Sequence, residues 1–144
     1  MVRTIQLKHE TQRSEDYLEA IFHLIHDKGY ASTVDISENL HVKPPTVTDM
    51  IKKLANGGYL VHEPYRGIKL TGKGEKIGKS VIARHRIIME FLSMLGVDQE
   101  VAYRDAEGIE HHTQPVTIYK IEKLVDFLRK NPNYLKAVRN YIDE

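Results

Sequence analysis

Residues 33–71 read TVDISENLHVKPPTVTDMIKKLANGGYLVHEPYRGIKLT, a run in which two short apolar-periodic segments are separated by a tight link. The first segment predicts a helix over residues 33–40. After the link, Pro44 and Pro45 suit only the first turn of a new helix, because proline there forfeits no internal hydrogen bond. Two short helices joined this closely predict a helix-turn-helix whose second helix covers residues 46–55.

A β-hairpin is expected directly after the second helix. The sequence Asn56-Gly57-Gly58 stops that helix, and residues 59–63 and 67–71 then have the composition of two short strands. Their connection, Pro64-Tyr65-Arg66-Gly67, combines turn-forming residues with a basic tip. A helix-turn-helix followed by such a hairpin is a winged helix.

The remainder of the chain is predicted to be helical, so the fold class is mainly α. We expect an N-terminal winged helix-turn-helix in residues 1–71, followed by an all-helical dimerisation domain in residues 72–144. Residues 1–12 are polar and lack clear periodicity, which predicts a loosely held arm. Apolar spacing, caps and prolines place the other helices at Ser14 to Lys28, about 72–95 (a long linking helix), about 98–112, 115–130 and 132–142.

Charge is distributed unevenly along a chain that is nearly neutral as a whole. Lys and Arg number 21 against 20 Asp and Glu in 144 residues. Residues 41–86 nevertheless hold ten basic and three acidic residues, a net charge of +7, whereas the rest of the chain is at −6. This asymmetry favours a polyanion-binding element. The absence of cysteine, of a membrane span and of a signal-peptide core predicts a cytoplasmic protein with no membrane partner.

The winged helix predicts a surface that binds double-stranded DNA. A helix fits the major groove, and its N-terminal residues reach base edges while flanking cations contact phosphates. Two alternatives stay open, because a threonine in a first helical turn is often only a cap and a loop arginine such as Arg66 is often only solvated. The candidates are Lys43, Pro44, Pro45, Thr46, Thr48 and Asp49 for reading or docking, Lys52 and Lys53 for phosphate, and Arg66 on the wing.

Acidic residues and a histidine cluster near the end of the chain. Glu107, Glu110 and His111 have the spacing i, i+3 and i+4, which puts them on one face of a helix. Two carboxylates and an imidazole without sulfur suit a hard or borderline divalent cation. Taken alone, such a cluster is more often a solvated acidic face, because E-x-x-E strings are common on helices. His85 falls on the inward stripe of the linking helix, where a histidine is more often a core residue than a ligand.

Several short runs together resemble the diphtheria toxin repressor family, in its manganese-responsive branch, from about Ser14 to the C-terminus. These runs are Glu15-Asp16-Tyr17-Leu18-Glu19, Arg84-His85, Glu107-Gly108-Ile109-Glu110-His111-His112 and the wing sequence Tyr65-Arg66-Gly67. Carried over position by position, the resemblance implies the metal ligands Asp16, Glu19, His85, Glu107, Glu110 and His111, with the backbone carbonyl of Glu107 as a further donor. The N-terminal arm and Pro45 depart from the family pattern, so the operator sequence is left open.

The resemblance implies a homodimeric repressor of manganese homeostasis, not an enzyme, that binds a palindromic operator when two Mn²⁺ ions per subunit act as corepressor. Four carboxylates balance two divalent ions in charge, and Fe²⁺, Co²⁺, Cd²⁺ or Zn²⁺ are expected to compete. One alternative is a winged-helix regulator that answers iron or an organic ligand. A di-iron enzyme of the ferritin type is a further alternative, but it needs two E-x-x-H copies in a four-helix bundle. Gly57-Gly58, Pro64 and Gly67 interrupt the chain where another long helix would be required.

Overall fold

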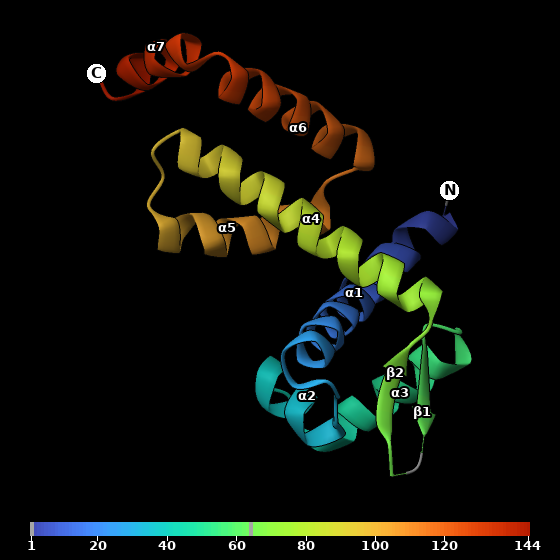
Figure 1. Cartoon of the computed structure of the whole chain (residues 1–144). Helices are drawn as coiled ribbons and strands as arrows, with labels where there is room; N and C mark the ends of the chain where they lie inside the picture. Colours follow the sequence, from blue (N-terminus) through green and yellow to red (C-terminus); the bar gives the residue numbers. More distant parts are fainter. Residues whose placement is uncertain (1, 64) are drawn as a thin grey trace. The chain divides into compact units, whose positions relative to one another are not determined.

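The computed structural model describes residues 2–63 and 65–144, with side chains from Gln12 onward (Figure 1). It divides into two compact units, residues 1–81 and residues 82–144. The predicted class is confirmed, because a helix-turn-helix and a two-stranded hairpin are followed by helices alone. The elements are α1 (Val2–Lys28), α2 (Thr33–Leu40), α3 (Pro44–Asn56), β1 (Leu60–Glu63), β2 (Gly67–Leu70), α4 (Gly72–Met94), α5 (Gln99–His112), α6 (Pro115–Lys130) and α7 (Pro132–Ile142).

The winged-helix unit is built around one apolar core. Helix α2 begins with a capping box, in which the Ser32 side chain accepts from Asp35 N and the Asp35 side chain accepts from Ser32 N. Helix α3 starts at its two prolines and turns one apolar face inward. Residues from α1, α2, α3 and both strands meet in this core, and its fully buried members include Leu18, Ile21, Ile36, Val47, Leu60 and Ile68.

The hairpin is antiparallel, with Leu60 opposite Leu70 and Glu63 opposite Gly67. Its turn requires positive φ angles, which are 69° at Tyr65 and 80° at Gly67. The Ile68 N–H donates to the carbonyl of Ala31 at 3.1 Å, so β2 is also tied to the connection between α1 and α2. The wing therefore has a fixed base and a tip that projects from the core.

The helical unit has a smaller core formed by α4, α5 and α6. The Asp98 side chain caps α5 by accepting from Glu100 N at 3.1 Å. Ala102, Ala106 and Glu110 recur every four residues on its buried face, so one acidic side chain occupies a position that would otherwise be apolar. Ile88 of α4 and Ile118 of α6 pack in the cluster around Ala106.

The predicted start of the first helix at Ser14 is wrong, because α1 begins at Val2. Residues 2–13 contain Gln, Lys, Glu and Arg but no Gly or Pro, so their intrinsic propensity favours a helix that carries no apolar stripe to reveal it. The looseness predicted for residues 1–12 concerns mostly side chains outside the described part, and it stays a prediction. The strands are one residue shorter than predicted where each borders a neighbouring helix.

The first half of α4 belongs to the winged-helix unit, whose limit is Val81. A Cβ added at Gly78 would lie 3.1 Å from Phe22 Cβ and 3.2 Å from Leu18 O, so α4 passes very close to α1 there. The compact units thus divide within the linking helix, whereas the sequence placed a domain boundary at 71/72. Helix α4 begins at Gly72 and runs without a break past Val81. The domain boundary at 71/72 stays a prediction.

Candidate metal centre and nucleic-acid interface

Three predicted metal ligands converge within the helical unit. His85 Nδ1 on α4 lies 3.4 Å from Glu107 Oε1 and 3.4 Å from Glu110 Oε2, both on α5. One potential ligand atom from each of these residues lies within 4.8 Å of the others. The Glu110 side chain is 0% exposed and that of His85 is 13% exposed. A carboxylate removed from water needs nearby positive charge or hydrogen-bond donors, and this geometry suits a cation.

His111 adjoins the same cluster through Glu110. Its Nε2 atom lies 3.3 Å from Glu110 Oε1, and its side chain is only 3% exposed. The donor set of this unit is therefore two carboxylates and two imidazoles, without sulfur. Oxygen donors completed by imidazole fit Mn²⁺ and related divalent ions better than a soft metal.

Asp16 and Glu19 are the two predicted ligands that lie in the winged-helix unit. They are one turn apart on α1, beside the buried residues Tyr17 and Leu18, and both are half-buried. Glu19 Oε1 lies 3.9 Å from His23 Nε2. The spacing places both carboxylates on one side of α1. Their role as ligands together with the cluster of the other unit belongs to the proposal below.

Sequence reasoning did not single out Tyr103, which lies at the edge of the cluster. Its ring meets that of His85 edge to face at an interplanar angle of 74°, with centroids 5.0 Å apart. Tyr103 is four residues before Glu107 and therefore on the same side of α5. That spacing was a usable signal, but an aromatic residue four positions from an acid is too common to stand out.

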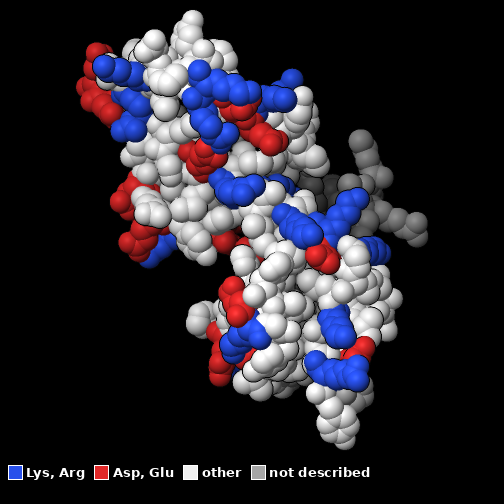
Figure 2. Space-filling view, viewed as in Figure 1, with Lys and Arg blue, Asp and Glu red and all other residues white. Residues whose placement is uncertain are grey.

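The predicted DNA-facing residues form the outer surface of the helix-turn-helix and the wing. Val47, Ile51 and Leu54 are buried against the core, which leaves the polar face of α3 in solvent. All nine candidates are exposed, namely Lys43, Pro44, Pro45, Thr46, Thr48, Asp49, Lys52, Lys53 and Arg66. The Thr48 hydroxyl donates to Pro44 O at 3.1 Å, so its methyl group and the acceptor lone pairs of its oxygen are left for a base. Figure 2 shows Lys and Arg side chains, in blue, along the hairpin and the start of α4.

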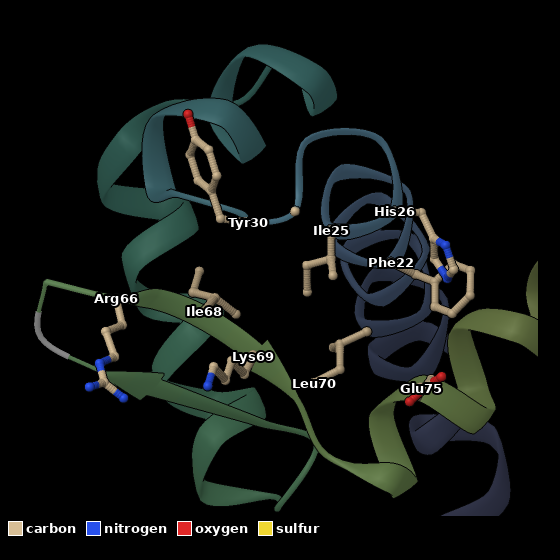
Figure 3. A pocket seen from close by; sticks show the side chains of 10 residues that line it. Phe22, Ile25, His26, Tyr30, Arg66, Ile68, Lys69, Leu70 and Glu75 are labelled. Carbon is tan, nitrogen blue, oxygen red and sulfur yellow. The ribbon is translucent and has the colours of Figure 1, made fainter.

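A hollow of about 330 Å³ lies within the winged-helix unit, between the end of α1 and β2 (Figure 3). Its floor is apolar, with Ile25 facing Ile68 and Leu70 across it. Among the charged residues that line it, Glu75 pairs with Lys79 at 3.0 Å and Arg66 with Glu63 at 4.0 Å, and Lys69 is exposed. Ligand sites combine apolar walls with a few convergent polar groups. The hollow by itself assigns no organic ligand.

A winged helix joined by a long helix to a unit with a His and Glu cluster defines a class of protein, the metal-responsive DNA-binding regulators. Comparison with known proteins agrees. The family model described as iron dependent repressor, N-terminal DNA binding domain, matches residues 9–68. A second model, iron dependent repressor, metal binding and dimerisation domain, matches residues 71–137. The chain belongs to the iron-dependent repressor family.

Relatives in this family are transcriptional regulators. The HTH-type transcriptional regulator MntR of Lysinibacillus sphaericus is 49% identical over 128 residues, covering 89% of this chain and 92% of the relative. The protein of the same description from Bacillus subtilis is 47% identical over 130 residues, covering 90% and 92%. Both matches extend over nearly the whole of each relative.

Solved structures share the fold. The metal-dependent transcriptional regulator MtsR has a TM-score of 0.73 at 30% identity and 79% coverage of this chain. The manganese regulator SloR has a TM-score of 0.70, also at 30% identity and 79% coverage. This chain spans 54% of the length of each of these solved chains. Among the described residues, no helix has the length and apolar character needed to cross a membrane.

Proposed function

We propose that this protein is a manganese transport regulator, a repressor that binds its operator when Mn²⁺ is bound. The observation that supports the proposal most is that His85 and Glu107 lie beside the carboxylate of Glu110, whose side chain is fully buried. The name of the matched family points to iron, whereas the relatives named above include a manganese regulator. The wholly oxygen and nitrogen donor set, in a chain without cysteine, favours Mn²⁺.

We propose a dinuclear centre with two Mn²⁺ per subunit. The proposed ligand set contains four carboxylates, which is more than one Mn²⁺ ion needs, and two divalent ions neutralise their charge. Fe²⁺, Co²⁺, Cd²⁺ and Zn²⁺ would compete for these donors, so selectivity must come from geometry. The proposed ligands are Asp16, Glu19, His85, Glu107, Glu110 and His111, with the Glu107 carbonyl as a further donor.

The ligands are divided between the two units. Asp16 and Glu19 belong to the unit that reads DNA, and the other four belong to the helical unit. A metal centre that uses ligands from both units restricts the range of orientations that the units sample. Without metal, the carboxylates repel one another and the range of orientations broadens. A dimer contacts two half-sites only when its recognition helices are about 34 Å apart. A coupling of about 1 to 3 kcal/mol per subunit is enough to switch occupancy.

We further propose that the helical unit forms a homodimer and that the operator is palindromic, since the symmetry of the site follows that of the protein. Large exposed apolar side chains concentrate in this unit, as expected of an association surface. They include Val116, Tyr119, Leu124 and Phe127 on α6, and Tyr134, Tyr141 and Ile142 on α7. Such a regulator acts where the DNA is, in the cytoplasm, and has no enzymatic activity.

The proposal is tested by titrating the protein on candidate palindromic DNA with Mn²⁺, Fe²⁺ and Zn²⁺, and with a chelator. Mn²⁺ is expected to raise operator affinity most. An ion that prefers tetrahedral coordination, such as Zn²⁺, is expected to fill one position without completing the second. Equal operator affinity with Mn²⁺ and with chelator would overturn the proposal. A stronger response to Fe²⁺ than to Mn²⁺ would assign the protein to iron regulation instead.

A further inference from the structure

We propose that a set of hydrogen bonds, called here the polar clamp, fixes the orientation of the recognition helix α3 relative to the start of the linking helix α4. Through these bonds, metal binding at α4 changes the orientation of the DNA-reading surface. The inference rests on the proposed function, because it explains how a metal bound at α4 would be sensed by α3. The clamp consists of Thr71, Lys73 and Gly74 at the start of α4, and of Gly57, Gly58 and Tyr59 after α3.

Groups at the start of α4 donate hydrogen bonds to three successive backbone carbonyls that follow α3. Lys73 Nζ donates to Gly57 O at 3.1 Å. The Thr71 hydroxyl donates to Gly58 O at 2.6 Å. The Thr71 backbone N–H donates to Tyr59 O at 3.1 Å. Because Gly57 is the C-cap residue of α3, these bonds hold the end of the recognition helix itself.

Packing makes the clamp tight as well as polar. A Cβ added at Gly74 would lie 2.0 Å from Tyr59 O, so only glycine allows the two backbones to approach this closely. Lys73 Nζ also lies 4.2 Å from the centroid of the Tyr59 ring, a cation–π contact. That ring in turn covers Gly57, where an added Cβ would lie 2.8 Å from Tyr59 Cε2.

The clamp connects a helix that carries a proposed metal ligand with the helix proposed to contact DNA bases. Lys73 is twelve residues before His85 in the same continuous helix, α4. On the other side, α3 carries Thr46 and Thr48 on its exposed face. The rest of α3 is held by apolar side chains such as Ile51, whose contacts are not directional. Directional bonds at the clamp therefore set the orientation of α3 relative to the first turn of α4.

The competing role for Lys73 is to neutralise a DNA phosphate directly, because its side chain is exposed in the basic middle of the chain. The two roles predict different measurements. Removing a phosphate-binding cation lowers affinity for DNA with and without metal, and flattens the slope of log affinity against log salt by about 0.9. Loosening the clamp lowers only the gain in affinity that the metal provides.

The test compares Lys73→Met with the matched control Lys76→Met, an exposed lysine one turn away in α4. Operator affinity is measured with Mn²⁺ and with chelator, and Mn²⁺ affinity is measured separately without DNA. In Lys73→Met the ratio of the two operator affinities should fall about fivefold or more, since allosteric couplings span about 5- to 150-fold. Mn²⁺ affinity and the salt slope should stay unchanged. Lys73→Arg, which retains a donor and a cation, should keep most of the ratio.

An unchanged ratio in Lys73→Met overturns the clamp and leaves the proposed function intact, whereas a wild-type protein that is indifferent to Mn²⁺ overturns both. Thr71→Val provides a second variant of similar shape in case Lys73→Met fails to fold. It removes the hydroxyl that donates to Gly58 O and should reduce the ratio in the same direction, while Thr71→Ser should not. A full ratio in Thr71→Val would equally count against the clamp.

Discussion

Glu110 is the residue on which the candidate metal centre depends most. It occupies a buried position in the repeat Ala102, Ala106 and Glu110, with His85 and His111 as its neighbours at 3.4 and 3.3 Å. A carboxylate at an otherwise apolar position weakens folding unless it is compensated. We propose that this carboxylate binds a cation.

We predict that Glu110→Gln abolishes most of the thermal stabilisation by Mn²⁺. A ligand that binds only the folded state at 100 times its Kd stabilises it by about 2.7 kcal/mol, and the variant loses one charged donor. The measurement is the melting temperature with and without Mn²⁺. Glu100→Gln on the same helix is the control, because Glu100 is exposed and paired with Arg104 at 2.7 Å. A Glu110→Gln protein that retained the full rise would contradict the assignment.

For individual residues, the sequence predicted the candidate ligands of the helical unit better than the side chains that pack around them. Glu107 and Glu110 were identifiable because helical periodicity places residues three apart on one face. From periodicity alone His85 was identifiable only as an inward-facing residue, since its approach to α5 depends on how two helices pack. Its prediction as a ligand came from the family resemblance. The ring of Tyr103 near His85 depends on the same packing and was not predicted.

The exposed residues of α3 are expected to have two different roles, some contacting base edges and others contacting phosphates. We predict that Thr46→Ala and Thr48→Ala each weaken operator binding by about 1 to 3 kcal/mol and leave binding to random DNA nearly unchanged, as expected of side chains that touch base edges. The measurement is affinity for both kinds of DNA. Equal weakening on operator and random DNA would mean that specificity comes from the wing or from DNA shape.

Lys52 and Lys53 on the same helix should behave in the opposite way. Replacing either by Ala should weaken binding to all sequences and flatten the slope of log affinity against log salt by about 0.9 for each phosphate that the variant no longer neutralises. Arg66 on the wing is expected to follow them. A steep salt slope that is unchanged in Lys52→Ala would remove that lysine from the interface.

The cap of α2 predicts an acid-sensitive contribution to stability. Hydrogen bonds from the Ser32 hydroxyl and then from Lys28 hold the pKa of Asp35 below its ordinary value of 3.8. A lowered folded-state pKa stabilises the protein above the ordinary value, and this stabilisation is lost as pH falls through the folded-state pKa. Urea unfolding should therefore show wild type more stable than Asp35→Asn at pH 6, with the difference shrinking below about pH 4. A pH-independent difference would contradict this origin.

Elements whose ends carry distinctive residues were predicted closely, and others were not. The prolines at 115 and 132 mark helix starts that the structure reproduces, whereas the helix predicted over residues 46–55 extends over Pro44–Asn56, because both prolines lie in its first turn. Helix α1 was predicted to start too late because the sequence of residues 2–13 has no clear apolar periodicity. The clamp at Thr71 and Lys73 was also missed, since bonds to loop carbonyls leave no periodic trace in the sequence.

For the whole molecule, the number of metal ions distinguishes a dinuclear centre from a single site. We predict that calorimetry saturates at two Mn²⁺ per chain, with Glu19 and Glu110 as the bridging carboxylates, because four carboxylates exceed the need of one ion. Glu19→Gln should lower the stoichiometry or abolish binding of the second ion. Saturation of the wild type at one ion per chain would contradict the dinuclear proposal.

We propose that bound metal restricts the orientation of the winged-helix unit relative to the helical unit. Since the chain has no cysteine, one dye can be attached to Asn39→Cys on α2 and another to Lys136→Cys on α7, both exposed positions. An excess of unlabelled protein ensures that each dimer carries one labelled subunit. Single-molecule energy transfer between the dyes then reports the distribution of distances between the units. We predict a broad distribution of distances in chelator that narrows with Mn²⁺, and a distribution that stays broad with Mn²⁺ in Asp16→Asn. Identical distributions with and without Mn²⁺, under conditions in which Mn²⁺ still promotes operator binding, would contradict it.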